Sequence, residues 1–200
     1  MHLPRLRALL ALFVVSLSLT LACSKPVDQT LPKLGKIGAF SLTNQSGKPF
    51  SAADLHGKVW VAAFFFTRCR SACPIISRRL HALQEQEKKL GGHVQLVSFS
   101  VDPENDTPQV MTAYAKQYHA DLSSWSFLTG KYDVIKGLAG DFKMALEGDS
   151  KKGASGMQLT HASQLALVDG NMQLRGYYST KSDADMKKLA KDAKRLSTGS

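Results

Sequence analysis

The sequence has few cysteines: three among 200 residues, at positions 23, 69 and 73. Small exported domains held together by disulfides usually carry more, so the count argues against a disulfide scaffold. Cys69 and Cys73 also enclose only a very short loop and cannot link distant segments. We therefore interpret this pair as functional rather than structural.

The sequence also lacks a hydrophobic run that spans a bilayer comfortably. The apolar run Ala8–Ala22 covers about 15 residues, whereas a transmembrane helix needs about 20. Arg5 and Arg7 precede it and a small residue ends it, a pattern that predicts a secretory signal peptide over residues 1–22. Cys23 follows in a context similar to a bacterial lipoprotein signal, although Thr20 stands where leucine is usual. We expect lipid attachment at Cys23; ordinary cleavage at the same place and an uncleaved anchor are the alternatives.

Acidic side chains are in the minority, 16 against 26 basic ones. Removal of residues 1–22 takes away Arg5 and Arg7 and leaves a net charge of about +8. Such a charge permits contact with anionic headgroups or an acidic protein. No nucleic-acid-binding motif is recognisable, so we expect no nucleic-acid partner and interpret most of the charge as a solvated surface.

The mature chain divides into a tether and one domain. Residues 23–36 contain Pro26, Pro32 and Gly35, which is typical of a tether. Residues 37–200 show no internal repeat and are long enough for a single domain with its own core.

The spacing of apolar residues and turn signals predicts a regular order of elements. In chain order these are a strand over Ile37–Thr43 followed by a turn, a buried strand over Lys58–Thr67, an amphipathic helix that stops at Gly91, a buried strand over Val94–Val101, a helix from Asp106, a short apolar piece at Trp125–Leu128, a helix over Tyr132–Ala145, a loop over Glu147–Gly156, two strands at Ser163–Val168 and Met172–Tyr178 joined by Asp169–Asn171, and a helix from Ser182. This order predicts an α/β, thioredoxin-like fold with an added N-terminal β-hairpin and an insert before the last β-hairpin.

Chemically reactive residues flank three of these strands. Cys69 and Cys73 follow Lys58–Thr67, Asp102 follows the next parallel strand, and His161 precedes a strand expected to run antiparallel to both. Because the carboxyl ends of parallel strands share one edge of a sheet, we expect all four residues to lie at that edge.

The cysteines are also expected at the amino end of a helix, because Pro74 suits a first helical turn. There the helix dipole and the neighbouring Arg68 and Arg70 favour a thiolate. The dipole contributes about 0.3–1 kcal/mol, whereas one pKa unit corresponds to about 1.36 kcal/mol. The dipole therefore prepares a thiolate without completing the ionisation.

Two thiolates and one imidazole form a soft set of metal ligands. Thiolates select Cu(I), zinc or iron–sulfur clusters, and imidazole suits copper and zinc. Structural zinc takes four protein ligands, and iron–sulfur clusters usually need four cysteines, whereas only Cys69, Cys73 and His161 are evident here. From the residues alone, a copper site and a reversible disulfide both remain open.

Three motifs, together with His161, point to one family of proteins. The segments Phe65–Pro74 and Ser100–Pro108, together with His161 and the shorter Phe127–Gly130, resemble the Sco/SenC copper-handling proteins, over about residues 37–178. The resemblance implies a thioredoxin-like fold in which Cys69, Cys73 and His161 bind one copper ion, as Cu(I), Cu(II) or both. It further implies a metallochaperone that delivers copper to the binuclear centre of cytochrome c oxidase subunit II, or to another copper protein. Arg70 departs from the family, in which many members have proline after the first cysteine.

Two other functions use the same residues. A thiol–disulfide oxidoreductase that keeps the target cysteines reduced would use Cys69 and Cys73 as catalytic residues. As a sole function it is disfavoured by the Cys-x-x-x-Cys spacing and by the lack of a proline before the strand that follows His161. A passive copper sensor or buffer is the third reading. We therefore do not expect catalysis to be the main role.

The remaining assignments are less specific. Asp102 is interpreted as an acceptor behind the metal ligands, as a weak metal contact or as a turn residue before Pro103. The histidines that fit no comparable site are interpreted as surface or end-capping residues: His56, His81, His93 and His119. We expect a monomer in the bacterial cell envelope, anchored through Cys23 on the extracytoplasmic, periplasmic side of the membrane.

Overall fold

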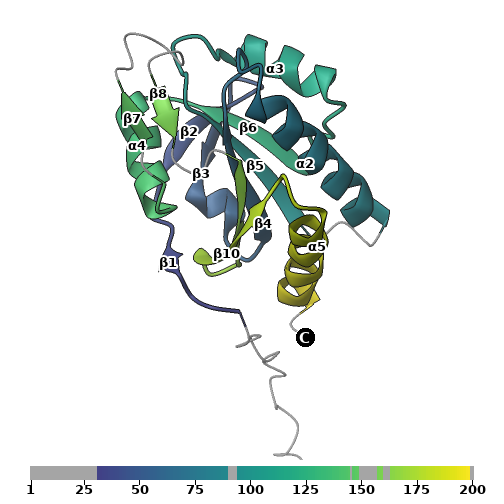
Figure 1. Ribbon diagram of the computed structural model, residues 1–200. Coiled ribbons are helices and arrows are strands. Elements are labelled where there is room, and N and C mark those ends of the chain that lie inside the picture. The colour runs from purple at the N-terminus through teal and green to yellow at the C-terminus, as the bar shows by residue number, and fades with distance from the viewer. Residues whose placement is uncertain (1–30, 90–93, 145, 149–156, 160–162, 199–200) are drawn as a thin grey trace, which may run out of the picture.

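The computed structural model describes residues 31–89, 94–144, 146–148, 157–159 and 163–198. The strands are β1 (Gly35–Lys36), β2 (Ser41–Asn44), β3 (Pro49–Ser51), β4 (Val59–Phe65), β5 (Val94–Ser100), β6 (Trp125–Thr129), β7 (Leu146–Gly148), β8 (Met157–Leu159), β9 (Gln164–Val168) and β10 (Gln173–Ser179). The helices are the short 3-10 helix η1 (Ala52–Leu55), α2 (Ala72–Lys89), α3 (Pro108–Gln117), α4 (Tyr132–Asp141) and α5 (Asp183–Thr198). An eight-stranded sheet in the order β1-β10-β9-β4-β5-β6-β2-β3 forms the centre of the molecule (Figure 1).

Strand β4 lies in the middle of this sheet and is buried at every position. It runs parallel to β5 and antiparallel to β9, as predicted. Val61 and Phe65 belong to one hydrophobic cluster and Trp60 and Phe64 to the other, because successive side chains of a strand point to opposite faces. The continuous apolar run is therefore explained by helices on both sides of the sheet.

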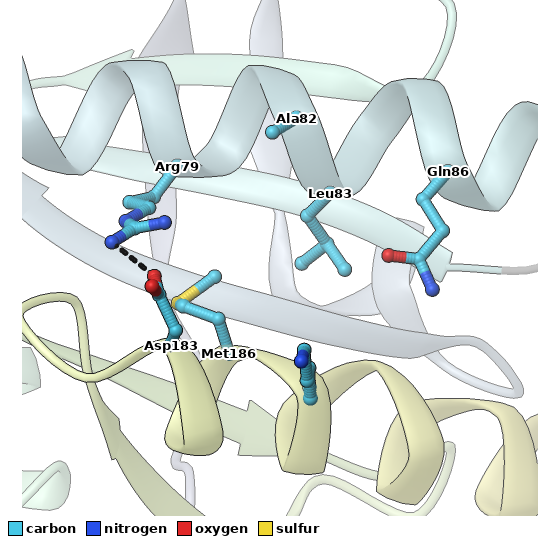
Figure 2. Close-up of a pocket in the computed structure, with 7 residues that line it drawn as sticks. Arg79, Ala82, Leu83, Gln86, Asp183 and Met186 are labelled. Atoms are coloured by element: carbon cyan, nitrogen blue, oxygen red, sulfur yellow. Dashed lines mark ion pairs between the residues drawn. The ribbon is translucent and has the colours of Figure 1, made fainter.

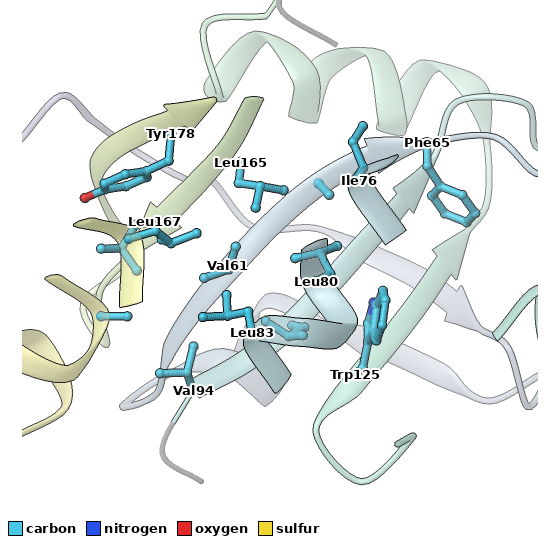
Figure 3. Close-up of a cluster of buried hydrophobic side chains, with 14 of the residues drawn as sticks. Val61, Phe65, Ile76, Leu80, Leu83, Val94, Trp125, Leu165, Leu167 and Tyr178 are labelled. Carbon is cyan, nitrogen blue, oxygen red and sulfur yellow. The ribbon is translucent and has the colours of Figure 1, made fainter. Parts of the chain in front are cut away.

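Helices α2, α3 and α5 contribute to the cluster on one face, and η1 and α4 contribute to the other. Helices α2 and α5 pack side by side and are joined by an ion pair between Arg79 Nη2 and Asp183 Oδ1 at 2.6 Å (Figure 2). Beneath them, Leu80 and Leu83 of α2 pack with Val61 of β4 (Figure 3). This packing fixes the amino end of α2 relative to the central strands.

Both predicted hairpins are present. Strands β2 and β3 pair antiparallel with Leu42 opposite Phe50, which confirms the added N-terminal hairpin. Strands β9 and β10 also pair antiparallel. Asp169 closes their turn, because its Oδ1 accepts hydrogen bonds from the backbone N–H groups of Asn171 at 2.9 Å and Gln173 at 3.0 Å.

Some element boundaries differ from the prediction. The apolar piece at Trp125–Leu128 is the full strand β6, parallel to β5. Helix α4 ends at Asp141 rather than Ala145, because Lys143 adopts a left-handed backbone with φ 54°. The first two residues of the expected loop Glu147–Gly156 belong to β7, which pairs with β8; residues 149–156 lie outside the described part of the chain.

Residues 31–36, which we expected to be tether, pack on the domain. Leu31 is buried, β1 pairs with β10, and the Leu34 N–H donates to the Leu174 carbonyl at 2.8 Å. Arg175 binds the carbonyl oxygens of Leu31 and Pro32 at 2.8 and 3.1 Å. In the described ranges, no helix is both long and apolar enough to cross a membrane.

Candidate metal centre

The carboxyl ends of β4 and β5 meet at one edge of the sheet. Phe65, the last residue of β4, lies opposite Ser100, the last residue of β5. Strand β9 pairs with β4 through Trp60–Val168 and Ala62–Ala166, so β9 begins at this same edge. The topology therefore brings the ends of β4 and β5 and the start of β9 to one edge of the sheet, as predicted.

Cys69 and Cys73 lie at this edge, at the amino end of α2. The Cys73 backbone N–H donates to Cys69 Sγ at 3.3 Å, and Ser71 Oγ lies 3.9 Å from the same sulfur. The first N–H groups of a helix have no partner within the helix, so the Cys69 sulfur serves as an acceptor for one of them. Both cysteines are free thiols in the structure.

The environments of the two sulfurs differ. Cys69 is partly exposed, whereas Cys73 is 4% exposed and belongs to the cluster that contains Phe65 and Ile76. Partial burial raises the pKa of Cys69, but hydrogen bonds from Cys73 and Ser71 outweigh it and bring the pKa below the ordinary value. Burial raises the pKa of Cys73 far above the ordinary value, and its hydrogen bond to Cys69 adds to this effect. Cys69 is thus the more readily ionised thiol.

Asp102 is held in a dense set of contacts. Its Oδ2 accepts from Arg68 Nε at 3.2 Å and Nη2 at 2.8 Å, and its Oδ1 accepts from Asn105 Nδ2 at 2.8 Å. Its backbone carbonyl also accepts from Asn105 and Asp106, as in a turn. The guanidinium expected to favour a thiolate is therefore paired with a buried carboxylate, and the lowered pKa of Cys69 comes from hydrogen bonds instead.

Asp106 is a site residue that the sequence reasoning used only to mark a helix start. It is fully buried, and its carboxylate accepts from Thr67 Oγ1 and Ser100 Oγ, both at 2.5 Å, and from the Thr67 N–H at 3.1 Å. Burial raises its pKa, against the lowering effect of these hydrogen bonds. Asp106 thereby ties the segment that leads into Cys69 to the end of β5. The signal in the sequence that could have identified Asp106 is an acidic residue shortly after a buried parallel strand.

Helix α3 begins at Pro108, two residues after the predicted start. Thr107 is the N-cap and its side chain accepts from the Val110 N–H at 3.3 Å, while Pro108 is the first helical residue. Asp106 therefore does not cap this helix, and its carboxylate binds Thr67 in the loop that leads to Cys69.

His161 and Cys23 lie outside the described residues, and their roles remain predictions. The nearest described residue after His161 is Ser163, whose carbonyl accepts from the Thr180 N–H at 2.9 Å and fixes the start of β9. His93 is also outside the described ranges. His56 is the C-cap of η1, which confirms the end-capping interpretation, and His119 is an exposed residue after the C-cap Tyr118 of α3, which confirms the surface interpretation. His81 lies in the middle of α2 and is partly buried, so the interpretation as a surface or end-capping residue is wrong for it.

A separate groove of about 250 Å³ lies between α2 and α5 (Figure 2). Arg79 and Asp183 form an ion pair across it, and Leu83 and Met186 also line it. None of its lining residues belongs to the cysteine edge of the sheet, so the groove is not part of the candidate centre.

Comparison with known proteins decides the family. The sequence matches SCO1/SenC over residues 28–198. This chain belongs to the SCO1/SenC family. The SCO1 protein homolog of Bacillus subtilis is 32% identical over 165 residues, which cover 82% of this chain and 83% of that protein. The expected resemblance is confirmed.

Solved structures of SCO1/SenC proteins share the fold. A SCO1/SenC family lipoprotein from Bacillus anthracis has a TM-score of 0.75 and 35% identity, covering 84% of this chain and 98% of that one. BsSco, a member of the Sco family of cytochrome c oxidase assembly proteins with a disulfide switch, has a TM-score of 0.73 and 31% identity, covering 85% and 98%. ScoI of Bradyrhizobium japonicum, solved with copper bound, has a TM-score of 0.66 and 25% identity, covering 80% and 98%. The mixed α/β, thioredoxin-like fold is thus that of Sco structures.

Proposed function

We propose that this SCO1/SenC protein is a copper metallochaperone that binds one copper ion through Cys69, Cys73 and His161. The observation that carries the proposal is the pair of unlike thiols at the amino end of α2, on the edge where β9 begins. The copper-bound ScoI structure supports it from within the same family. We further propose that the target is the binuclear copper centre of cytochrome c oxidase subunit II.

Copper is the cargo, and the thiols suit both its capture and its release. Cys69 is the accessible thiol and the more readily ionised one, so it meets the ion first. Cys73 must lose a proton to bind, and a thiol that coordinates a metal is deprotonated outright. Capture therefore releases the protons that the two thiols still carry. In transfer, incoming target thiolates reach the exposed side of the site first, which is the side of Cys69.

Asp102 and Asp106 are proposed to position the cysteine loop without touching the ion. Asp102 fixes Arg68, the residue before Cys69, and Asp106 fixes Thr67. Two buried carboxylates thus hold the two residues that precede the first cysteine. This arrangement supports the reading of Asp102 as an acceptor behind the ligands.

Thiol–disulfide exchange is a second candidate function, favoured by the unequal pKa values of the thiols. The Cys69 thiolate would attack a target disulfide, form a mixed disulfide and release one target thiolate. Cys73, after losing its proton, would attack Cys69 Sγ, form the Cys69–Cys73 disulfide and release the second target thiolate. Two electrons pass to the target, and a thiol reductant must then reduce the pair. The disulfide switch described for BsSco supports this candidate.

Oxidase assembly in cells distinguishes the two functions. We expect both His161→Ala and the double variant Cys69→Ser/Cys73→Ser to lose copper and to lose oxidase activity, with His56→Ala as the matched histidine control. Full oxidase assembly by a His161→Ala protein that no longer binds copper would show that reduction, not delivery, is the function.

We also propose the cellular arrangement. Residues 1–22 are a signal peptide, Cys23 carries a lipid, residues 23–36 include the tether, and the domain works as a monomer on the periplasmic face of the membrane. The SCO1/SenC lipoprotein of Bacillus anthracis supports the anchor. The test is incorporation of a labelled fatty acid, which Cys23→Ser should abolish; unchanged labelling would contradict the anchor.

A further inference from the structure

Two histidines outside the cysteine site face each other across two helices. His81 lies in the middle of α2, and His119 lies just beyond the end of α3. Their ring centroids are 6.1 Å apart and the ring planes are inclined by 51°. The residues are far apart in the sequence, so the packing of α2 against α3 brings the rings together.

The fold holds both histidines in place. Ser77, one turn before His81, hydrogen-bonds the Tyr114 hydroxyl at 2.8 Å and so joins α2 to α3. His119 has a left-handed backbone with φ 54°, and its N–H donates to the Lys116 carbonyl at 3.1 Å. Such a position after a helix ordinarily favours glycine or asparagine. The hydrogen bond to Lys116 therefore fixes the backbone turn that carries the His119 side chain.

His81 also has an unsatisfied polar atom. Its Nδ1 is buried and has no hydrogen-bond partner among the described residues. Leaving a buried polar atom without a partner costs about 1–3 kcal/mol. A ring contact between the two histidines does not give Nδ1 a partner, whereas an ion coordinated by Nδ1 itself does.

The separation of the rings suits a shared metal ion. An ion about 2.0–2.1 Å from one nitrogen of each ring places the ring centres about 5–6.5 Å apart, depending on the angle at the metal. Imidazole suits copper, zinc and nickel, and Cu(II) binds most tightly of the divalent first-row ions. Within the described ranges no third histidine, cysteine or acidic residue completes a cluster, so water would supply the other ligands.

We propose that His81 and His119 form a second metal site, which takes a divalent ion of the copper, zinc and nickel class and prefers Cu(II). The site is separate from the cysteine edge, because His81 is eight residues beyond Cys73 and thus about 12 Å further along α2. With two protein ligands it binds more weakly than the cysteine centre and exchanges its ion more readily. It gives this chain a second position for Cu(II), about 12 Å along α2 from Cys73.

The test uses the untagged chain with the proposed cysteine centre removed, Cys69→Ser/Cys73→Ser/His161→Ala. Cu(II) is titrated and followed by electron paramagnetic resonance. We expect about one bound ion per chain, with hyperfine splitting from imidazole nitrogens. Adding His81→Gln or His119→Asn should remove this signal. Because the background lacks the cysteine centre, the result is independent of the proposed delivery function.

The variants are chosen to separate metal binding from folding. Asparagine tolerates the left-handed backbone of residue 119, and far-ultraviolet circular dichroism should show both variants folded. His56→Gln removes an exposed histidine elsewhere and should leave the signal unchanged. No copper signal in the background protein, a signal unaffected by both His81→Gln and His119→Asn, or an equal loss with His56→Gln would overturn the proposal.

Discussion

At the scale of single residues, the two thiols of the candidate centre are chemically unlike although only three residues separate them. Cys69 accepts a helix N–H and has a lowered pKa, whereas Cys73 is packed into the core and has a raised pKa. In the proposed copper capture or disulfide exchange, this difference gives each thiol a distinct role, with Cys69 as the residue that a partner meets first.

This difference predicts selective alkylation. One pKa unit changes the thiolate fraction about tenfold near neutral pH, and Cys73 is also shielded by burial, so Cys69 should react with iodoacetamide at least tenfold faster. Its rate should rise with pH to a midpoint below 9.0, the value of an ordinary cysteine. Mass spectrometry of the labelled peptides measures both rates.

Denaturation is the control for that measurement. In concentrated urea both thiols lose their surroundings and should react at similar rates. Equal rates in the native protein, or faster labelling of Cys73, would contradict the assignment of Cys69 as the accessible thiolate.

Asp106 carries a second prediction at this scale. In Asp106→Asn, an amide N–H₂ group replaces one acceptor oxygen among three donors, from the Thr67 backbone and hydroxyl and the Ser100 hydroxyl. We expect a loss of about 1–3 kcal/mol in the free energy of unfolding, measured by urea denaturation, and faster labelling of Cys73. The exposed neighbour Glu104, changed to glutamine, is the matched control and should alter neither quantity. A stable Asp106→Asn protein with native labelling rates would show that Asp106 does not hold the loop.

At the scale of elements, the sequence was most informative where one pattern filled a whole element. The apolar run of β4, the helical spacing in α2 and the turn at Asp169 each predicted the right element, because each depends on local burial or turn chemistry. The end of α4 was missed, since it depends on the left-handed backbone of Lys143. The packing of residues 31–36 was missed because it depends on Arg175, which is distant in the sequence.

The candidate site also has features that the sequence predicted and features that it did not. The edge shared by β4, β5 and β9 followed from strand order, and the placement of Cys69 and Cys73 followed from it. The pairing of Arg68 with Asp102, and of Thr67 with Asp106, did not, because side-chain partners between two loops leave no periodic signal. Contacts of that kind need the three-dimensional structure.

The hairpin of β9 and β10 supports a prediction about buried charge. Asp169 Oδ2 binds Arg175 Nη1 at 2.6 Å, and their side chains are 8% and 0% exposed. Removing one carboxylate breaks a buried ion pair, so Asp169→Ala should lower the free energy of unfolding by about 3–5 kcal/mol. Urea denaturation measures the change.

The exposed ion pair between α2 and α5 is the control for that prediction. Asp183 is 76% exposed and its partner Arg79 is 37% exposed. Solvent screens such a pair, so Asp183→Ala should cost no more than about 1 kcal/mol. Equal losses in the two variants would show that burial of the Asp169–Arg175 pair does not matter.

At the scale of the whole molecule, the sheet topology joins three distant segments into one reactive edge. The segments that follow β4 and β5 are locked together by Asp102 and Asp106, and the start of β9 is fixed through Ser163 and Thr180. These contacts tie the two residues that precede Cys69 to the loop after β5. In the proposed transfer, they would keep the cysteine loop in one orientation while the ion is exchanged.

The central claim is that copper is held by both thiols and by His161, and the copper coordination shell tests it directly. X-ray absorption spectroscopy on the Cu(I)-loaded chain, in a His81→Gln/His119→Asn background that removes the second site, counts sulfur and nitrogen ligands. We predict two sulfur ligands and one nitrogen ligand, with the nitrogen lost in His161→Ala and both sulfurs lost in Cys69→Ser/Cys73→Ser. A copper shell without sulfur, or an unchanged shell in His161→Ala, would contradict the claim.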